Sequence, residues 1–503
     1  MNELLTALLF VLSPAPFAFL LLGVVSGIVF GAIPGLSGGM LIALCIPLTY
    51  AMDSKLALVM FVAMYVASVA GGLISATLLR MPGTPSSVMT TFDGFPMARA
   101  GKAGRALGLG IGASFVGGML AGVVLVLLAP PLSRWAVAFG PWEYFTMVLM
   151  ALVLIASLSQ GSMIKGLVSG ILGMIVAMPG ISEADGNLRL TFGFHQLDAG
   201  FDLVPVLLGV FVISQVIRDV VEMDRPREAL KVGASSVMLG LSDFARHGVN
   251  MLRSSVIGTW IGILPGVGAS VSSMIAYATA KSLSRTPERF GTGAEEGVIA
   301  SEAANNANVG GALIPIVAMG IPGSPICAIL IGALILHNIQ PGPMLFITHR
   351  DLTWAIIAAY LVANVLMFVI MLGTARWMAR LITINRAYLL PAIVFFCIVG
   401  AYAVSNRMFD VWALLGFGVL GYFMERARYP LGPFVIGFVL FRILETELRS
   451  GLMASAGSLM PLVQRPIALT FLSVAVLMLF YPLLLSWRRA RIDRAAAQPQ
   501  QLD

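Results

Sequence analysis

The stretches GIVFGAIPGLSGGM at residues 27–40 and GTWIGILPGVGASV at residues 258–271 share one arrangement of glycine and proline. Four positions recur at a constant offset of 231, where Gly27, Gly31, Pro34 and Gly35 correspond to Gly258, Gly262, Pro265 and Gly266. A second pair of stretches, GGLISATLLRMPGTPSS at 71–87 and GALIPIVAMGIPGSPIC at 311–327, matches at an offset of 240. Self-similarity of this kind predicts two homologous halves within one chain.

Each of these stretches contains a Pro-Gly pair in apolar surroundings, and such pairs break helices. Broken backbone at membrane depth is tolerated only where it is buried in protein or lines a cavity. Ahead of the first break, Gly23, Gly27 and Gly31 recur at four-residue spacing, which gives a smooth helix face for close packing. We therefore expect tight helix pairs before the breaks and a cavity at the breaks.

The composition identifies the class of protein. The chain has 503 residues, of which 58% are hydrophobic and 11% charged, whereas a soluble domain has about 25% charged residues. The mean hydropathy is +0.94. The apolar runs are continuous and do not alternate, which favours helices over a barrel. Because a spanning helix needs about 20 apolar residues, we predict an all-α polytopic membrane protein with roughly 10–14 transmembrane or re-entrant helices.

The distribution of charge predicts how the two halves are related. In the first half a basic cluster, Arg99 to Arg105, follows the second Pro-Gly motif, whereas in the second half the cluster Lys281 to Arg289 precedes it. The loop 182–202 is mainly acidic and reads as external. If Lys and Arg stay in the cytoplasm, the halves are upside down relative to each other. Such inverted-topology repeats are common in secondary transporters.

We therefore expect a single integral membrane domain over residues 1–503. Its predicted parts are a first repeat (15–204), a cytoplasmic linker region (205–250), a second repeat (251–425), C-terminal scaffold helices (426–487) and a basic cytoplasmic tail (488–503). The net charge of +7 fits a positive cytoplasmic side. No basic run is interleaved with aromatic residues, so we expect no nucleic-acid partner.

Two short segments are candidates for binding an anionic substrate. They are Ser37-Gly38-Gly39 after the first break and Thr84-Pro85-Ser86-Ser87 in the second motif, whose counterpart contains Ser324. A Ser or Thr followed by Pro favours a helix start with the hydroxyl as N-cap, and free N–H groups at a helix start suit a carboxylate. The alternatives are helix packing for the glycines and an ordinary capped helix in a water-facing loop.

A third segment, EEGVIASEAANNANVGG at 295–311, carries polar groups that are costly in a membrane unless they form a site. Amide and carboxylate oxygens suit a hard cation such as Na⁺. The predicted cation-binding residues are Asn305, Asn306, Gly323 and Glu302. The alternative is a simple loop that re-enters the membrane. Cys45, Cys327 and Cys397 form no CxxC pair, and we expect no transition-metal site.

An enzyme is not expected. The four histidines are scattered, with no HExxH motif, and the chain has no Walker lysine motif. Ser37 and Ser87 have no obvious base nearby in the sequence, and no catalytic residue is assigned.

The strings GAIPGLSGGMLIALCIPLTY (31–50), GGLISATLLRMPGTPSSVMTTFDGFPMARAGKAGRALG (71–108) and PGPM (341–344) closely resemble the TctA family over nearly the whole chain. These are the large membrane subunits of bacterial tripartite tricarboxylate transporters. The resemblance implies a subunit of the bacterial inner membrane with a cytoplasmic C-terminus. Its implied partners are a small four-helix membrane subunit (TctB-like) and a periplasmic solute-binding protein (TctC-like).

The resemblance also implies symport of citrate, other tricarboxylates, dicarboxylates or aromatic acids with Na⁺ or H⁺, and no other cofactor. Few basic residues lie within the apolar segments, Arg80 being the chief exception. We hypothesise that helix starts and hydroxyls hold the carboxylates, and that alternating access follows an elevator-like displacement. The open alternatives are the large subunit of a TRAP-type dicarboxylate transporter, a membrane channel and an intramembrane enzyme.

Overall fold

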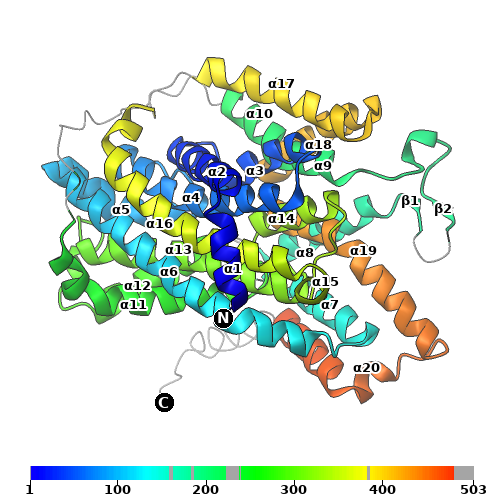
Figure 1. Cartoon of the computed structure of the whole chain (residues 1–503). Coiled ribbons are helices and arrows are strands. Elements are labelled where there is room, and N and C mark those ends of the chain that lie inside the picture. The colour runs from blue at the N-terminus through cyan, green and yellow to red at the C-terminus, as the bar shows by residue number, and fades with distance from the viewer. Residues whose placement is uncertain are drawn as a thin grey trace, which may run out of the picture.

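A computed structural model describes residues 2–157, 162–182, 186–221, 237, 239–381 and 386–480. Nearly all of the described residues with regular structure are helical; the two short strands β1 (Gly180–Ile181) and β2 (Leu188–Arg189) pair antiparallel, with Gly180 opposite Arg189. The hairpin projects from the side of the helical body (Figure 1). The predicted all-α polytopic fold is confirmed. The predicted basic tail at 488–503 lies outside the described residues.

The elements before residue 222 are α1 (Asn2–Val11), α2 (Pro14–Ala32), α3 (Gly38–Cys45), η1 (Pro47–Thr49), α4 (Ser54–Leu79), η2 (Pro85–Val88), α5 (Thr90–Met97), η3 (Ala98–Lys102), α6 (Ala103–Ala136), α7 (Pro141–Ser157), α8 (Met163–Ala177), η4 (His195–Leu197), α9 (Leu203–Leu207), η5 (Leu208–Ile213) and α10 (Ser214–Val221). The later elements are α11 (Leu241–Ile263), α12 (Gly268–Leu283), η6 (Pro287–Arg289), α13 (Glu295–Met319), α14 (Pro325–Leu336), α15 (Leu345–Thr348), α16 (Arg350–Leu381), α17 (Arg386–Ser405), α18 (Met408–Arg426), α19 (Leu431–Ala454) and α20 (Pro461–Gln464).

Among the described residues, six helical segments are long and apolar enough to cross a membrane. They are Pro14–Ala32, Ser54–Leu79, Thr90–Ala136, Leu203–Val221, Arg350–Thr374 and Met408–Arg426. Shorter apolar helices accompany them, including α3 and α14. Residues 205–221 of the predicted linker region belong to one of these six segments, whereas 222–236 and 238 lie outside the described residues.

The predicted helix breaks are present in both halves. α2 and α3 are separated at Pro34-Gly35, and α11 and α12 at Pro265-Gly266, with Gly35 at φ 94° and Gly266 at φ 74°. α4 and α13 each end on a left-handed residue, Arg80 and Gly320, at the offset of 240 found in the sequence. The element order α2, α3, α4 is therefore repeated as α11, α12, α13.

Helix packing before the breaks also repeats, and it explains the glycine ladder. A Cβ on Gly31 would overlap the carbonyl oxygen of Ser68 on α4, and one on Gly262 would lie 2.5 Å from the carbonyl oxygen of Asn308 on α13. Ser68 and Asn308 again differ by 240. Since only glycine permits these backbone contacts, α2 packs against α4 and α11 against α13 in the same register.

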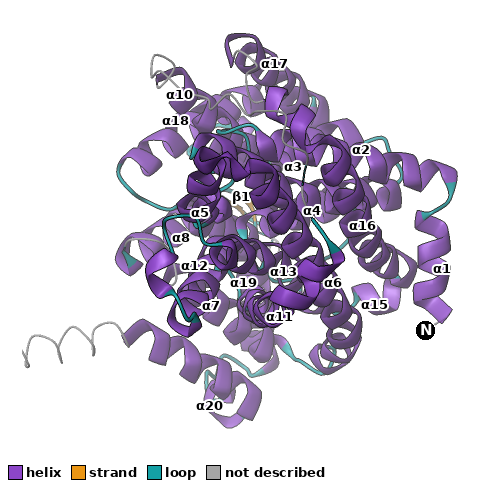
Figure 2. Cartoon of the chain, turned by 90° about the vertical axis from the view of Figure 1, so that its left-hand side faces the viewer, coloured by secondary structure: helices purple, strands orange, loops and turns teal. Residues whose placement is uncertain are grey.

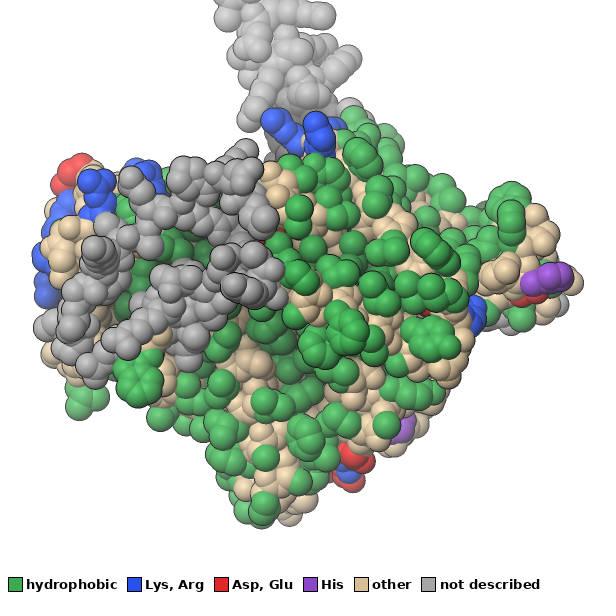
Figure 3. All heavy atoms as spheres, turned by 90° about the horizontal axis from the view of Figure 1, so that it is seen from above, with side chains coloured by type: hydrophobic (Ala, Val, Ile, Leu, Met, Phe, Trp, Pro, Cys, Tyr) green, Lys and Arg blue, Asp and Glu red, His purple; other side chains and the backbone are tan. Residues whose placement is uncertain are grey.

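The two helices α4 and α13 form the interior of the molecule. Residues 57–78 of α4 and 297–318 of α13 are all buried, and both helices lie near the centre in Figure 2, flanked by α6 and α16. Residues 295–311 belong to one continuous helix, so the alternative of a re-entering loop is wrong. The outer face drawn in Figure 3 is mostly hydrophobic, with charged side chains near its margins, as expected of a surface that contacts lipid.

Candidate functional site

A hydroxyl cluster occupies the second break of the first half. Thr84 Oγ1 lies 2.9 Å from Ser86 Oγ and 2.9 Å from Ser87 Oγ, and all three side chains are buried. Pro85 is exposed. Gly72 on α4 makes room for the cluster, because a Cβ there would overlap Ser87 Oγ and would lie 2.7 Å from Thr84 Oγ1. The side chains predicted to bind substrate at this motif are therefore gathered at one point.

The expectation that Thr84 caps a helix is wrong. Its side chain makes no capping hydrogen bond, because Pro85 starts only the short 3₁₀ turn η2 and the hydroxyl bonds to Ser86 and Ser87 instead. The same expectation is correct at Ser324, whose Oγ accepts from the backbone N–H of Cys327 at 3.2 Å at the start of α14. Ser37 likewise caps α3 by accepting from the N–H of Met40 at 3.1 Å.

Ser324 belongs to a second hydroxyl cluster, in the matching break of the second half. Its Oγ lies 3.0 Å from the hydroxyl of Tyr65, which extends from α4, and both side chains are buried. Cys327 Sγ lies 3.9 Å from the same tyrosine hydroxyl. Tyr65 was not predicted as a site residue, because an aromatic residue in an apolar helix is typical of a hydrophobic core.

The start of α3 lies beside this second cluster. A Cβ on Gly39 would lie 3.1 Å from Cδ1 of Ile329 and 3.4 Å from Cγ1 of Ile326, both on α14. A Cβ on Gly38 would overlap the hydroxyl of Ser68. The predicted substrate segment 37–39 thus meets the break that contains Ser324, and these two segments come from opposite halves of the chain.

Polar side chains on α13 form a third cluster. The carboxylate of Glu302 accepts from Thr90 Oγ1 at 2.5 Å and from Ser114 Oγ at 3.3 Å. Nδ2 of Asn306 donates to the same Ser114 at 2.8 Å. All four residues are buried. Within the described part of the chain no cationic group pairs with Glu302, so its charge is balanced only by hydroxyl dipoles unless a proton or cation is bound.

Of the remaining predicted cation ligands, Asn305 lies beside the same carboxyl and Gly323 lies elsewhere. Asn305 is fully buried and its amide interacts with the Glu302 carboxyl, but neither side-chain atom makes a close hydrogen bond to a described residue. The carbonyl oxygen of Gly323 accepts from the N–H of Gly266 at 2.9 Å and so ties the two breaks of the second half together. The described residues contain no cluster of three or more His, Cys, Asp or Glu side chains suited to a metal ion.

Arg80, the basic residue closest in sequence to the Thr84 cluster, is exposed at the end of α4, and its guanidinium lies 5.9 Å from the ring centre of Phe95. It is therefore turned to the surface. The buried clusters offer hydroxyl, amide and backbone N–H donors to a ligand. Such donors can hold an anion, and neutral donors release it more readily than a fixed charge would.

Asp93 was missed by the sequence analysis and is the most heavily hydrogen-bonded carboxylate near the site. Its Oδ1 accepts from the backbone N–H groups of Gly291, Gly293 and Ala294 at 2.8–2.9 Å, and its Oδ2 accepts from the hydroxyl of Tyr277 at 2.8 Å. The carboxylate thereby fixes α5 of the first half to the loop before α13. The available signal is the acidic Asp93-Gly94 pair within FDGFPM (92–97).

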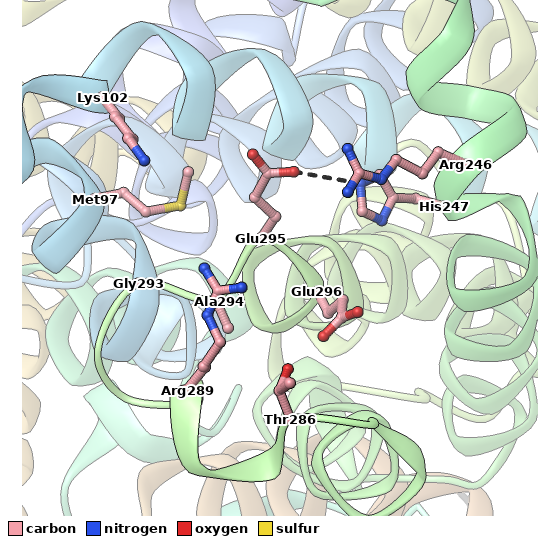
Figure 4. A pocket seen from close by; sticks show the side chains of 10 residues that line it. All are labelled: Met97, Lys102, Arg246, His247, Thr286, Arg289, Gly293, Ala294, Glu295 and Glu296. Atoms are coloured by element: carbon pink, nitrogen blue, oxygen red, sulfur yellow. Dashed lines mark ion pairs between the residues drawn. The ribbon is translucent and has the colours of Figure 1, made fainter.

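Beyond this loop lies a polar pocket of about 190 Å³ at the start of α13 (Figure 4). Lys102, Arg246 and Arg289 line it, together with Glu295, which points toward His247 with 3.3 Å between Oε2 and Nε2. Arg105 binds both Asp243 and Glu295, with a shortest distance of 2.6 Å to Asp243. Hydrogen bonding from His247, and then from Arg105, lowers the pKa of Glu295 to about 2.

Comparison with known protein families identifies one family. A family model described as the tripartite tricarboxylate transporter TctA family matches residues 17–436. The chain is 35% identical over 484 residues to an Agrobacterium vitis protein described as an uncharacterized 52.8 kDa protein in the TAR-I ttuC' 3' region, and the match covers 95% of each chain. It is 38% identical over 234 residues to an A. vitis protein described as an uncharacterized protein in the TAR-II ttuC' 3' region, which covers 46% of this chain and 97% of that relative. No solved structure matches the chain significantly.

Proposed function

The chain belongs to the tripartite tricarboxylate transporter TctA family, and from this premise we propose that it imports carboxylates by alternating access, coupled to Na⁺ or H⁺. It is a multi-pass membrane protein and, by family, the large subunit of a three-part transporter. The proposal includes location in a bacterial inner membrane with a cytoplasmic C-terminus. Its proposed partners are a small four-helix membrane subunit and a periplasmic solute-binding protein.

The observation that carries the proposal is the chemistry of the two buried breaks. Thr84, Ser86 and Ser87 on one side and Ser324 on the other supply neutral donors, and they lie at the breaks between α4 and α5 and between α13 and α14. Broken helices at membrane depth form the binding sites of many secondary transporters. A carboxylate held by such donors keeps a net charge, so a co-bound cation lowers the cost of its transfer.

Contacts between the halves support an inverted repeat over residues 15–204 and 251–425. Tyr65, in the middle of α4, meets Ser324, which follows the end of α13. Glu302, in the first half of α13, meets Thr90, which follows α4 as the first residue of α5. The equivalent helices α4 and α13 therefore run antiparallel. Two equivalent helices of opposite direction are what alternating access by inverted repeats requires.

Ion pairs at the two ends of this helix pair support the same arrangement. Lys55 at the start of α4 lies 3.5 Å from Asp351 at the start of α16. Glu295, the equivalent of Lys55 at the offset of 240, lies 3.0 Å from Arg105 at the start of α6. The end that carries Arg105, Arg246 and Lys102 is the more basic, and we assign it to the cytoplasm.

The proposal is tested by uptake into proteoliposomes that contain the chain with its small membrane subunit. Radiolabelled citrate, succinate and benzoate are offered with and without the periplasmic binding protein, under a Na⁺ gradient, a pH gradient or neither. We expect accumulation of at least one carboxylate that needs both the binding protein and one gradient. Uptake of none of them under any condition would overturn the assignment.

A further inference from the structure

We propose that Tyr65 is a substrate-binding residue, and that the site has two separate carboxylate subsites, Tyr65 with Ser324 and the Thr84 cluster with Asn305. The inference deepens the proposed function and rests on it. It predicts that the carried solute has at least two carboxylate groups, one for each subsite. It also assigns Asn305 to the anion, where the sequence had favoured a cation.

Tyr65 and Asn305 are equivalent positions in the two halves of the chain. The two positions differ by 240, the offset that relates Pro82-Gly83 to Pro322-Gly323. Close contacts confirm this register one residue before them, since a Cβ on Gly27 would lie 2.7 Å from the carbonyl oxygen of Met64, and one on Gly258 would overlap that of Ala304. Tyr65 and Asn305 therefore occupy the same place on the helices α4 and α13.

The central helix of each half packs against the second break of the other half. α4 packs against α14, whose N-cap Ser324 meets Tyr65. α13 packs against η2, which follows Thr84. Thr84 and Ser324 also differ by 240. Asn305 is thus expected to pair with the Thr84 cluster as Tyr65 pairs with Ser324. Each subsite therefore contains residues from both halves.

Counting hydroxyl hydrogens shows that each cluster has a donor without a strong acceptor. Tyr65 and Ser324 have two hydroxyl hydrogens and share one hydrogen bond, and the second hydrogen finds at best Cys327 Sγ, a weak acceptor 3.9 Å from the tyrosine hydroxyl. Thr84, Ser86 and Ser87 have three hydroxyl hydrogens and share two hydrogen bonds, so at least one hydrogen has no acceptor among the contacts of the described residues. A buried donor with a weak partner or none is costly.

Asn305 supplies the independent indication of a ligand. It is fully buried, its oxygen has no hydrogen-bond partner among the described residues, and its nitrogen interacts with the Glu302 carboxyl without a close hydrogen bond. An amide N–H₂ and spare hydroxyl hydrogens are donors, and two or three donors at one point suit a carboxylate. The two clusters remain distinct, because Gly72, against which Thr84 and Ser87 pack, lies about two helical turns after Tyr65 on α4.

The test uses the purified full-length chain in lipid nanodiscs, without the binding protein, so that selection by that partner does not enter. Affinities for tricarballylate, succinate and propionate are obtained from the ligand dependence of the melting temperature. We expect the wild type to bind tricarballylate and succinate at least about tenfold more tightly than propionate, because the second carboxylate adds hydrogen bonds worth roughly a tenfold change in affinity.

Tyr65→Phe removes one hydroxyl and keeps the ring. We expect it to weaken succinate binding by roughly tenfold while propionate, which uses the Thr84 subsite, binds as before. The matched control is Tyr360→Phe, because Tyr360 is equally buried but donates to the carbonyl oxygen of Gly118 at 2.9 Å, away from the breaks. Ser324→Ala repeats the test from the other side of the subsite if Tyr65→Phe lowers the yield of folded protein.

The possible outcomes distinguish a failure of the two-subsite inference from a failure of the proposed function. Equal loss of succinate and propionate affinity in Tyr65→Phe, or no loss of either, would overturn the two-subsite inference while the carboxylate carrier stands. Binding of none of the three carboxylates by the wild type would count against the proposed function itself, and the inference would fall with it.

Discussion

The hydroxyl of Thr90 lies 2.5 Å from the carboxylate of Glu302 and joins the second break of the first half to the central helix of the second. The two residues are 212 positions apart in the chain, and both are fully buried. A carboxylate in this place has no cationic partner among the described residues, so its hydroxyl donors are its main stabilisation. The contact therefore links the packing of the two halves to the charge of the site.

Removal of this contact gives the first prediction. Thr90→Val keeps the volume of the side chain and removes the hydroxyl, which leaves the Glu302 carboxyl with one donor fewer. We expect a loss of stability of about 1–3 kcal/mol, because a buried charged acceptor loses a hydrogen bond. The measurement is thermal unfolding of the purified chain in detergent. Thr91→Val is the matched control, since Thr91 lies next to Thr90 and its hydroxyl bonds only to the carbonyl oxygen of Val88 at an exposed position. Equal effects of the two changes would contradict the prediction.

The second prediction concerns the close packing of α2 and α4. Gly31→Ala would place a methyl group on the carbonyl oxygen of Ser68, backbone that cannot move aside cheaply. We expect destabilisation of about 1–3 kcal/mol or more and a lower yield of monodisperse protein in size-exclusion chromatography. Gly248→Ala on α11 is the matched control, because its Cβ would meet no atom within 4 Å. That change should be neutral or stabilising by up to about 1 kcal/mol.

The third prediction follows from the pKa of Glu295, which His247 and Arg105 lower to about 2. Because the folded pKa is below the ordinary value of 4.5, the ionised carboxyl stabilises the fold above about pH 4.5, and this contribution is lost as the pH falls toward 2. Glu295→Gln should lower the melting temperature at pH 7 and flatten its decline below pH 4.5. Glu288→Gln, at an exposed carboxyl, should leave the profile unchanged. A profile of Glu295→Gln parallel to wild type would contradict the assignment.

The fourth prediction tests the inverted arrangement. Asp351 and Arg289 are both exposed, and they lie near the starts of α16 and α13. Single cysteines at these positions, in a chain whose Cys45, Cys327 and Cys397 have been replaced by alanine, are treated with a membrane-impermeant maleimide in spheroplasts. Asp351→Cys should react from outside, and Arg289→Cys only after the membrane is permeabilised. Labelling of both from the same side would refute the inverted repeat.

The sequence allowed the local features of the site to be predicted. Pro34-Gly35 and Pro265-Gly266 break their helices as expected, because proline and glycine act on the backbone whatever surrounds them. The glycine ladder packs as expected, because a face without side chains admits a neighbouring backbone. Ser324 caps its helix for an equally local reason.

The features that were missed depend on contacts across the chain. Asp93 meets backbone groups 198–201 residues away, and no local pattern indicates which loop it will hold. Tyr65 reads as an apolar core residue until Ser324 is brought to its hydroxyl. Thr84 fails as a cap for a local reason, since its hydroxyl bonds to Ser86 and Ser87 and η2 does not continue as an α-helix. Long-range packing, which periodicity does not encode, decided the roles of Asp93 and Tyr65.

The central claim is that a gradient-driven carboxylate carrier binds its substrate at the hydroxyl cluster of the second break. It is tested most directly by accumulation of labelled citrate, succinate or benzoate in proteoliposomes with the partner proteins, comparing wild type with Ser86→Leu. Ser26→Leu is the control, because its hydroxyl lies on the outer part of α2 and bonds only to backbone carbonyls of Leu22 and Gly23. The account predicts gradient-dependent accumulation by the wild type and by Ser26→Leu, and none by Ser86→Leu at equal amounts of inserted protein. Gradient-independent equilibration, as through a channel, or unchanged accumulation by Ser86→Leu would contradict it.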